Sequence, residues 1–309
     1  MIGRIISLLV VVFLGHATAW GASYYVSPSG SGSTCSSGSP CSFTTGLNNA
    51  FAGDEVVAKN GTYNYSIQTV RSGSSGNPIV IRAENRHQAI LNQSGGVQDI
   101  SLDIDHDYIT VQGFVFDNQG EVNRGFFMVD LHPTGSNSTI NNFILEYNIL
   151  KNSGSGGVYM RNASNIILRH NKIDTTRLNS GNVGEGFYIG QNSNSPLTQN
   201  VEVYANWVTD TRDNFVDYKN PTRNVNVHHN IFENHISGDG LIRSQYDGSD
   251  TSSGNKFENN IVREATNPCC GIFYIDDKRV DIIGNVVYNI SSPNRFFNKD
   301  TAQIGRAHV

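Results

Sequence analysis

Ile166-Ile-Leu-Arg-His-Asn171 is a short alternating strand that ends in asparagine, and five further segments of the chain repeat this pattern. They are Phe143-Ile-Leu-Glu-Tyr-Asn148, Val201-Glu-Val-Tyr-Ala-Asn206, Val225-Asn-Val-His-His-Asn230, Asn255-Lys-Phe-Glu-Asn-Asn260 and Val280-Asp-Ile-Ile-Gly-Asn285. The six closing asparagines are 23, 35, 24, 30 and 25 residues apart. A unit of this size cannot bury its own apolar side chains and must stack on its copies, so the repeat predicts a solenoid with three short strands per coil.

The recurring asparagine has a structural explanation. An amide turned inward at a bend can bond to the backbone and to the asparagine of the next coil, because asparagine carries both donors and acceptors. Coils stacked through strand pairing lie about 4.8 Å apart, which lets such amides form a continuous ladder. The repeat therefore predicts a structural, not a catalytic, role for these asparagines.

The composition suits many short strands joined by turns, with 31 Gly and only 16% charged residues. The formal net charge of -5 argues against nucleic acid or an anionic membrane as partner. It is compatible with an acidic polysaccharide, because a basic cleft can lie on a mildly acidic surface. We expect a monomer.

Both ends of the chain carry segments that lie outside the predicted domain. Arg4 precedes an apolar run over residues 5–14 and small residues up to Ala19, which is the pattern of a secretory signal peptide over residues 1–19. The run is shorter than the roughly 20 residues of a membrane-spanning helix. We expect a secreted protein, extracellular or, in a Gram-negative source, periplasmic. Residues 304–309 match the translation of a sequencing adapter, which leaves one domain over residues 20–303 that we expect to continue in the natural protein.

The start of this domain contains Tyr24-Tyr-Val-Ser-Pro-Ser-Gly30, a helix expected over residues 44–51 and Asn60-Gly-Thr-Tyr63. In these features it resembles the pectate-lyase-like superfamily of right-handed parallel β-helix proteins. The resemblance implies an all-β fold, a right-handed parallel β-helix whose open amino end is capped by the short helix. Leu47, Ala50 and Phe51 would form the buried face of that helix.

The four cysteines fall into two close pairs. Export permits disulfides, and we expect Cys35 and Cys41 to form one that closes a small loop. Cys269 and Cys270 are adjacent, and we expect two buried thiols there. Neither pair has the spacing of a metal site.

A second set of strands brings polar side chains to one face. Its members are Gly157-Val-Tyr-Met-Arg161, Gly186-Phe-Tyr-Ile-Gly190, Phe215-Val-Asp-Tyr-Lys219, Leu241-Ile-Arg-Ser-Gln245 and Ile272-Phe-Tyr-Ile-Asp276. Alternation predicts that the inward residues are Val158, Phe187, Val216 and Ile242. The predicted outward residues are Tyr159, Tyr188, Asp217 and Arg243, followed two positions later by Arg161, Lys219 and Gln245. We expect substrate to bind along this row.

The sharpest chemical hypothesis is β-elimination of a uronate polysaccharide, which needs a cation against the carboxylate and a base for the adjacent proton. Asp217-Tyr-Lys219 followed by Gly240-Leu-Ile-Arg243 resembles the chondroitinase-B and alginate-lyase type of polysaccharide lyase. By that resemblance Lys219 would be the base and Arg243 the partner of the carboxylate. Tyr188, Arg161, Asp217, Gln245 and Tyr159 would bind substrate.

Calcium is an additional hypothesis. The calcium-binding acidic pair of that family does not recur in register, but Glu185, Asp213 and Asp217 lie close in the repeat and offer oxygen ligands.

Two other functions stay open. Glu185, Asp213, Asp217 or Asp239 could work as paired carboxylates of a glycoside hydrolase or an epimerase. A noncatalytic glycan-binding or adhesive protein could instead stack sugars on Tyr159, Tyr188, Tyr218 and Tyr274. Unsaturated products would distinguish a lyase from both.

Overall fold

The computed structural model describes residues 21–92, 100–118, 127–131, 133, 139–174, 176, 184–191, 197–236, 240–244, 252–266, 271–275, 280–291 and 297–298. The expected signal peptide, the last six residues, Gln245, Asp239 and the pair Cys269 and Cys270 lie outside these ranges. No helix among the described residues is long and apolar enough to cross a membrane.

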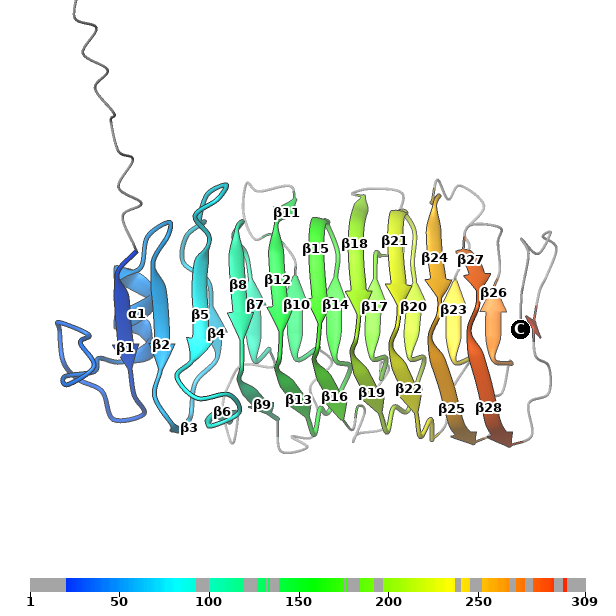
Figure 1. Ribbon diagram of the computed structural model, residues 1–309, viewed down its shortest axis with the longest axis horizontal. Helices are drawn as coiled ribbons and strands as arrows, with labels where there is room; N and C mark the ends of the chain where they lie inside the picture. The colour runs from blue at the N-terminus through cyan, green and yellow to red at the C-terminus, as the bar shows by residue number, and fades with distance from the viewer. Residues whose placement is uncertain are drawn as a thin grey trace, which may run out of the picture.

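Three parallel sheets run along the whole molecule and form the sides of a right-handed β-helix, which confirms the predicted fold (Figure 1). The first sheet contains β1 (Ser23–Val26), β2 (Glu55–Ala58), β5 (Ile79–Ala83), β8 (Ile109–Gln112), β11 (Ile140–Asn141), β12 (Phe143–Glu146), β15 (Ala163–Arg169), β18 (Thr198–Tyr204), β21 (Thr222–His228), β24 (Asn255–Glu258) and β27 (Val280–Ile283).

The chain passes from each coil of the first sheet into the second and then the third. The second sheet contains β3 (Gly61–Tyr63), β6 (Ala89–Asn92), β9 (Val115–Asp117), β13 (Ile149–Lys151), β16 (Lys172–Asp174), β19 (Trp207–Thr209), β22 (Ile231–Glu233), β25 (Ile261–Thr266) and β28 (Val286–Ser291). The third contains β4 (Ile67–Gln68), β7 (Leu102–Ile104), β10 (Val129–Leu131), β14 (Val158–Met160), β17 (Phe187–Ile189), β20 (Val216–Tyr218), β23 (Ile242–Ser244), β26 (Phe273–Ile275) and β29 (Phe297–Asn298).

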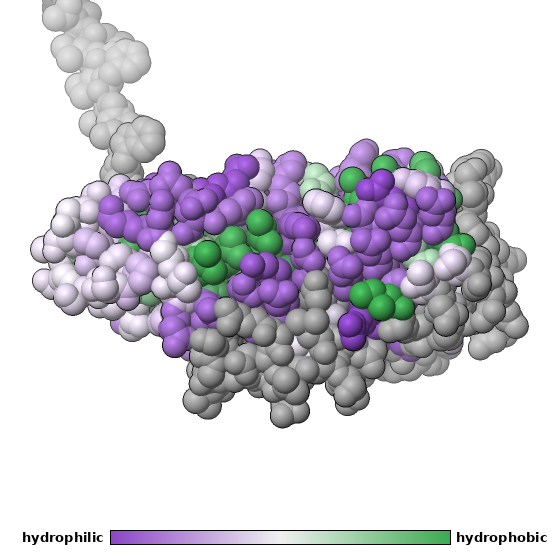
Figure 2. Space-filling view, turned by 90° about the horizontal axis from the view of Figure 1, so that it is seen from below, coloured by the Kyte–Doolittle hydropathy of each residue, from purple (hydrophilic) through white to green (hydrophobic). Residues whose placement is uncertain are grey.

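The core is a stack of apolar side chains inside the coils. Val158, Phe187, Val216 and Ile242 pair in register on the third sheet and are at most 1% exposed, as the alternation predicts. The described surface is largely hydrophilic in the view of Figure 2, with a few apolar patches. The fold therefore gains its stability from stacked coils and not from a central globular core.

The predicted asparagine ladder is present at the corner between the first and second sheets. Asn148, Asn171, Asn206, Asn230 and Asn260 each donate their side-chain amide to the Oδ1 of the next ladder asparagine, over 3.0 to 3.2 Å. The last acceptor is Asn285. The amides also donate to backbone carbonyls of the preceding coil, so the ladder satisfies buried backbone groups at a bend.

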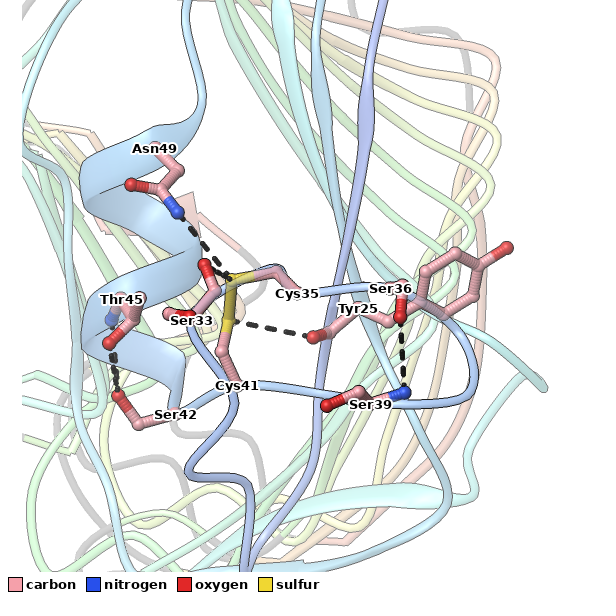
Figure 3. The surroundings of a disulfide bond; sticks show 9 residues. All are labelled: Tyr25, Ser33, Cys35, Ser36, Ser39, Cys41, Ser42, Thr45 and Asn49. Carbon is pink, nitrogen blue, oxygen red and sulfur yellow. Dashed lines mark hydrogen bonds between the residues drawn. A yellow bond between two sulfur atoms is a disulfide. The ribbon is translucent and has the colours of Figure 1, made fainter.

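The amino end is capped by α1 (Phe43–Asn49), slightly shorter than expected. The Ser42 hydroxyl accepts a hydrogen bond from the Thr45 amide at the start of the helix, and the expected disulfide joins Cys35 to Cys41 beside it (Figure 3). Leu47 and Ala50 are buried as predicted. The prediction for Phe51 is wrong: the helix ends before it, its side chain is 61% exposed, and the Arg71 guanidinium lies 4.1 Å from its ring centre.

Candidate functional site

The outward face of the third sheet presents one polar or aromatic residue per coil. These residues pair in register and run, in order, Asp103, Asp130, Tyr159, Tyr188, Asp217, Arg243 and Tyr274. The structure thus places four of the predicted site residues side by side on successive coils. We refer to these seven residues as the outward row.

Lys219 follows β20 and folds its side chain onto the outward row. Its Nζ lies 2.8 Å from Asp217 Oδ2, and the two side chains are 5% and 0% exposed. The same Nζ lies 5.0 Å from the centre of the Tyr188 ring. Burial raises the pKa of Asp217, an effect that the Lys219 and Arg243 charges oppose. The pair therefore carries two charges in a site where both are costly to maintain.

Tyr188 and Tyr159 form an aromatic wall next to Lys219. Their rings meet edge to face with centroids 4.8 Å apart. The centre of the Phe127 ring lies 5.1 Å from that of Tyr159 and 5.5 Å from that of Tyr188. Burial and the nearby Asp217 charge raise the pKa of Tyr188 well above its usual range. Tyr188 consequently keeps its phenolic proton at neutral pH, and releasing that proton costs more than it does for an exposed tyrosine.

Gly190, just after β17, lies where two coils approach each other closely. It occupies the place on β17's coil that Lys219 occupies on the next coil, and its φ is +93°. A Cβ there would lie 2.7 Å from the Lys219 carbonyl oxygen and 2.9 Å from Thr222 Cγ2. Glycine is therefore required both by the backbone conformation and by the close approach of the two coils.

Arg161 and Arg243 lie on either side of the Tyr188 and Lys219 pair. The Arg161 guanidinium lies 5.0 Å from the Tyr159 ring centre and 3.8 Å, from Nη2 to Oδ2, from the buried Asp130. Arg243 lies 5.7 Å from the Tyr274 ring centre and is paired in register with Asp217. Two half-buried arginines thus flank one lysine along the direction that a polymer would follow.

Glu185 adds a second buried carboxyl, just before β17. Burial raises its pKa to about 8, and the negative charges of Asp213 and Asp217 contribute. Glu185 Oε2 accepts a hydrogen bond from the Gly184 amide, whereas Asp217 is engaged by Lys219. In the described ranges no group of three or more His, Cys, Asp or Glu side chains is placed to hold a metal ion. The calcium site stays a prediction.

The amino-terminal end of the outward row is acidic, which the sequence reasoning missed. Gln68 Nε2 donates to Asp103 Oδ2 at 3.3 Å and to Asp105 Oδ2 at 3.4 Å, and Asp130 is buried on the next coil. Among the described residues of this face, Arg161, Lys219 and Arg243 lie on the later coils, beyond this acidic end. The available signal was the alternation of Val129-Asp-Leu131 and Leu102-Asp-Ile104, which matches the later strands.

Comparison with solved structures supports the fold. The chain is similar to an alginate lyase from Paenibacillus sp. str. FPU-7, with a TM-score of 0.63, 18% identity and coverage of 90% of this chain and 99% of that one. It is also similar to pectate lyase Pel9A, with a TM-score of 0.58, 15% identity and coverage of 89% of this chain and 79% of that one. A GH136 lacto-N-biosidase from Eubacterium ramulus matches with a TM-score of 0.55, 14% identity and coverage of 93% of this chain and 68% of that one. No family model and no curated protein matches the chain. The resemblance to the pectate-lyase-like parallel β-helix superfamily is confirmed at the level of fold.

Proposed function

We propose that the protein is a secreted polysaccharide lyase that cleaves a uronic-acid-containing polysaccharide, of the alginate or pectate type, by β-elimination. The observation that carries this proposal is the position of Lys219 between a protonated Tyr188 and the flanking Arg243 on one outward row. A base, an acid and a carboxylate-binding cation are the groups that the reaction needs. The similar solved structures include an alginate lyase and a pectate lyase, which supports the substrate class as a proposal.

In the proposed mechanism the Arg243 guanidinium binds the uronate carboxylate and stabilises the charge that develops on it. Lys219 removes the C5 proton, and the electron pair of that bond forms the C4–C5 double bond. The bond from C4 to the glycosidic oxygen then breaks, and the leaving oxygen takes the proton of the Tyr188 hydroxyl. The products are a 4,5-unsaturated uronate and a new chain end.

Lys219 must be uncharged when it accepts this proton. Asp217 is the adjacent acceptor, because its Oδ2 lies 2.8 Å from Lys219 Nζ and burial raises its pKa. Desolvation penalises the charged form of Asp217, which makes this carboxylate a better proton acceptor than an exposed aspartate. The Asp217 carboxyl thereby prepares the base and does not itself contact the C5 proton.

The test is incubation of the protein with alginate, polygalacturonate, glucuronan and a glycosaminoglycan while the ultraviolet absorbance of unsaturated products and the number of reducing ends are followed. We expect one polymer to give both signals, Lys219→Ala to abolish them, and Lys256→Ala, an exposed lysine of β24 on the first sheet, to leave them unchanged. Reducing ends without unsaturated product would identify a hydrolase instead. Binding without either signal would identify a glycan-binding protein. Repeating the assay with a chelator, and with calcium added back, tests the calcium hypothesis.

A further inference from the structure

A cavity of about 240 Å³ lies outside the outward row, at the corner where the first sheet turns into the second. Its lining includes Arg82, Glu84, Arg86, Gln112, Gly113 and Tyr147. These residues lie at or just after the ends of β5, β8 and β12, which are neighbours in Figure 1. Because each coil has three sides, this corner lies across the coil from the third sheet.

The corner that lines this cavity has no side chain on the coil of β8. In later coils the residue just before the ladder asparagine is Tyr147, His170, Ala205, His229, Asn259 or Gly284, with φ between 53° and 63°. The equivalent residue on the coil of β8 is Gly113, with φ +82°. A Cβ at Gly113 would approach Ala83 Cβ no closer than 3.5 Å, so the missing side chain leaves free space instead of relieving a clash.

Arg86 is held at the rim of this space. Its guanidinium lies 4.0 Å from the centre of the Tyr147 ring. The other partner of that ring is His170, stacked at 4.8 Å with an interplanar angle of 3°, and His87 Nε2 contacts the Tyr147 carbonyl oxygen at 2.7 Å. A guanidinium fixed by an aromatic face keeps its N–H donors available in the plane of the group.

The charges around the cavity leave Arg86 without compensation. Arg82 pairs with Glu55 at 2.6 Å, and Lys59 pairs with Glu84 at 3.6 Å. Within the described part of the chain, the side chains of Arg86 and Gln112 form no hydrogen bond or ion pair. The cavity therefore offers one unpaired positive charge and one free amide to a small polar ligand.

We propose that this corner cavity binds a single carboxylate-bearing sugar unit and is a second glycan site. Arg86 takes the carboxylate through paired N–H donors, and the Gln112 amide takes a ring hydroxyl. A volume of about 240 Å³ is below the roughly 300–1,000 Å³ of sites for drug-sized ligands, which fits one sugar ring and not a chain segment. The choice of a sugar acid rests on the proposed function. A polymer whose terminal unit occupies this cavity would be held close to the protein, which would raise the effective concentration of substrate at the outward row.

The test uses the full-length Lys219→Ala protein, which cannot turn substrate over, and follows the Gln112 side-chain amide by NMR. D-galacturonate, D-glucuronate and D-mannuronate are titrated in turn, with methyl galactoside and inorganic phosphate as comparisons. We expect at least one uronate to shift the Gln112 resonances saturably, and Arg86→Ala to weaken that binding at least tenfold. Arg223→Ala, which removes an exposed arginine of β21, should leave the affinity unchanged.

Three results would overturn the proposal. One is the absence of any uronate-dependent shift at Gln112, and another is equal binding of methyl galactoside, which would remove the role of the carboxylate. The third is equal binding of phosphate, which would make the cavity a general anion site. Because the measurement needs no turnover, it is independent of the lyase assay, and either proposal can fail while the other holds.

Discussion

Lys219 Nζ and Asp217 Oδ2 lie 2.8 Å apart on the outward face of β20, with both side chains almost fully removed from solvent. Two residues separated by one position on a strand share a face, so their contact follows from the backbone. The burial of the pair does not follow from the backbone. Because both charges are buried, a substitution that removes one of them should change the stability of the protein as well as its activity.

Removal of one partner of this pair should destabilise the protein. Asp217→Ala deprives the buried Lys219 ammonium of the Asp217 carboxylate, and we expect the free energy of unfolding to fall by about 3–5 kcal/mol. The double variant Asp217→Ala with Lys219→Met removes both charges and should recover most of that loss. Urea denaturation, monitored by circular dichroism, gives the free energy of unfolding of the wild type, the single variant and the double variant. Equal stability of Asp217→Ala and the wild type would contradict a buried pair.

Tyr188→Phe tests the proposed acid without disturbing the packing of the ring. The Tyr188 hydroxyl makes no hydrogen bond within the described residues, so the thermal midpoint should not change. Loss of general acid catalysis should lower kcat by about 10²–10⁴-fold, with KM little affected. Tyr159→Phe is the matched control on the neighbouring coil and should retain kcat within tenfold. Steady-state kinetics on the polymer identified in the lyase assay provides both numbers.

Gly190→Ala should damage both the fold and the site. The φ of +93° disfavours any side chain, and a Cβ would lie 2.7 Å from the Lys219 carbonyl oxygen. We expect a loss of stability of about 1–3 kcal/mol from backbone strain and a lower kcat from displacement of Lys219. Gly38→Ala is the control, because a Cβ at Gly38 has no atom within 4 Å. If both variants unfold at the same denaturant concentration, the close approach of the coils is not important.

The repeat was sufficient to predict the ladder, the inward side chains and the outward row from Tyr159 to Arg243. Each of those features depends on strand alternation and on an asparagine at a fixed place, both of which are local in the sequence. The prediction was wrong for Tyr218 as a sugar-stacking residue, because Tyr218 is 1% exposed and its hydroxyl donates to the Lys256 carbonyl. The row before Tyr159 was missed because the first coils lack the asparagine that sets the phase. Phe114 stands at the ladder position on the coil of β8, and its backbone amide donates to Asn148 Oδ1 at 2.9 Å.

Burial and charge compensation could not be predicted in the same way. Alternation places Lys219 and Arg161 on the outward face, but it does not show that Lys219 is 5% exposed or that Arg161 lies 3.8 Å from Asp130 on the preceding coil. These distances depend on side-chain conformations and on the register between segments about thirty residues apart. The error at Phe51 has a simpler origin, since the helix ends two residues earlier than its apolar pattern suggests.

Asn206→Ala should show how much one rung of the ladder contributes. Asn206 Oδ1 accepts from the Asn171 amide at 2.9 Å, and its Nδ2 donates to the Leu168 carbonyl and to Asn230 Oδ1. Alanine leaves these buried groups without partners, and each unsatisfied group costs about 1–3 kcal/mol. We expect the free energy of unfolding to fall by at least about 2 kcal/mol. Asn226→Ala, whose side chain makes no hydrogen bond within the described residues, should change it by much less.

His235 should make the stability of the protein fall in acid. Its imidazole is 1% exposed, lies 5.7 Å from the Phe215 ring centre, and has a pKa that burial lowers from 6.5 to about 4. Between these two pKa values the unfolded chain binds a proton that the folded protein does not, so the contribution of His235 to stability is complete above pH 6.5 and decreases as the pH falls toward 4. The full loss is about 3 kcal/mol. His235→Gln should flatten this part of the stability profile, measured by urea unfolding at each pH, whereas His229→Gln, at an exposed corner, should reproduce the wild-type slope. Glu185 and Asp217 have raised pKa values and act in the opposite direction in both proteins, so the test is the difference between the two profiles. Equal slopes in the wild type and in His235→Gln between pH 6.5 and 4 would show that His235 is not acid-sensitive.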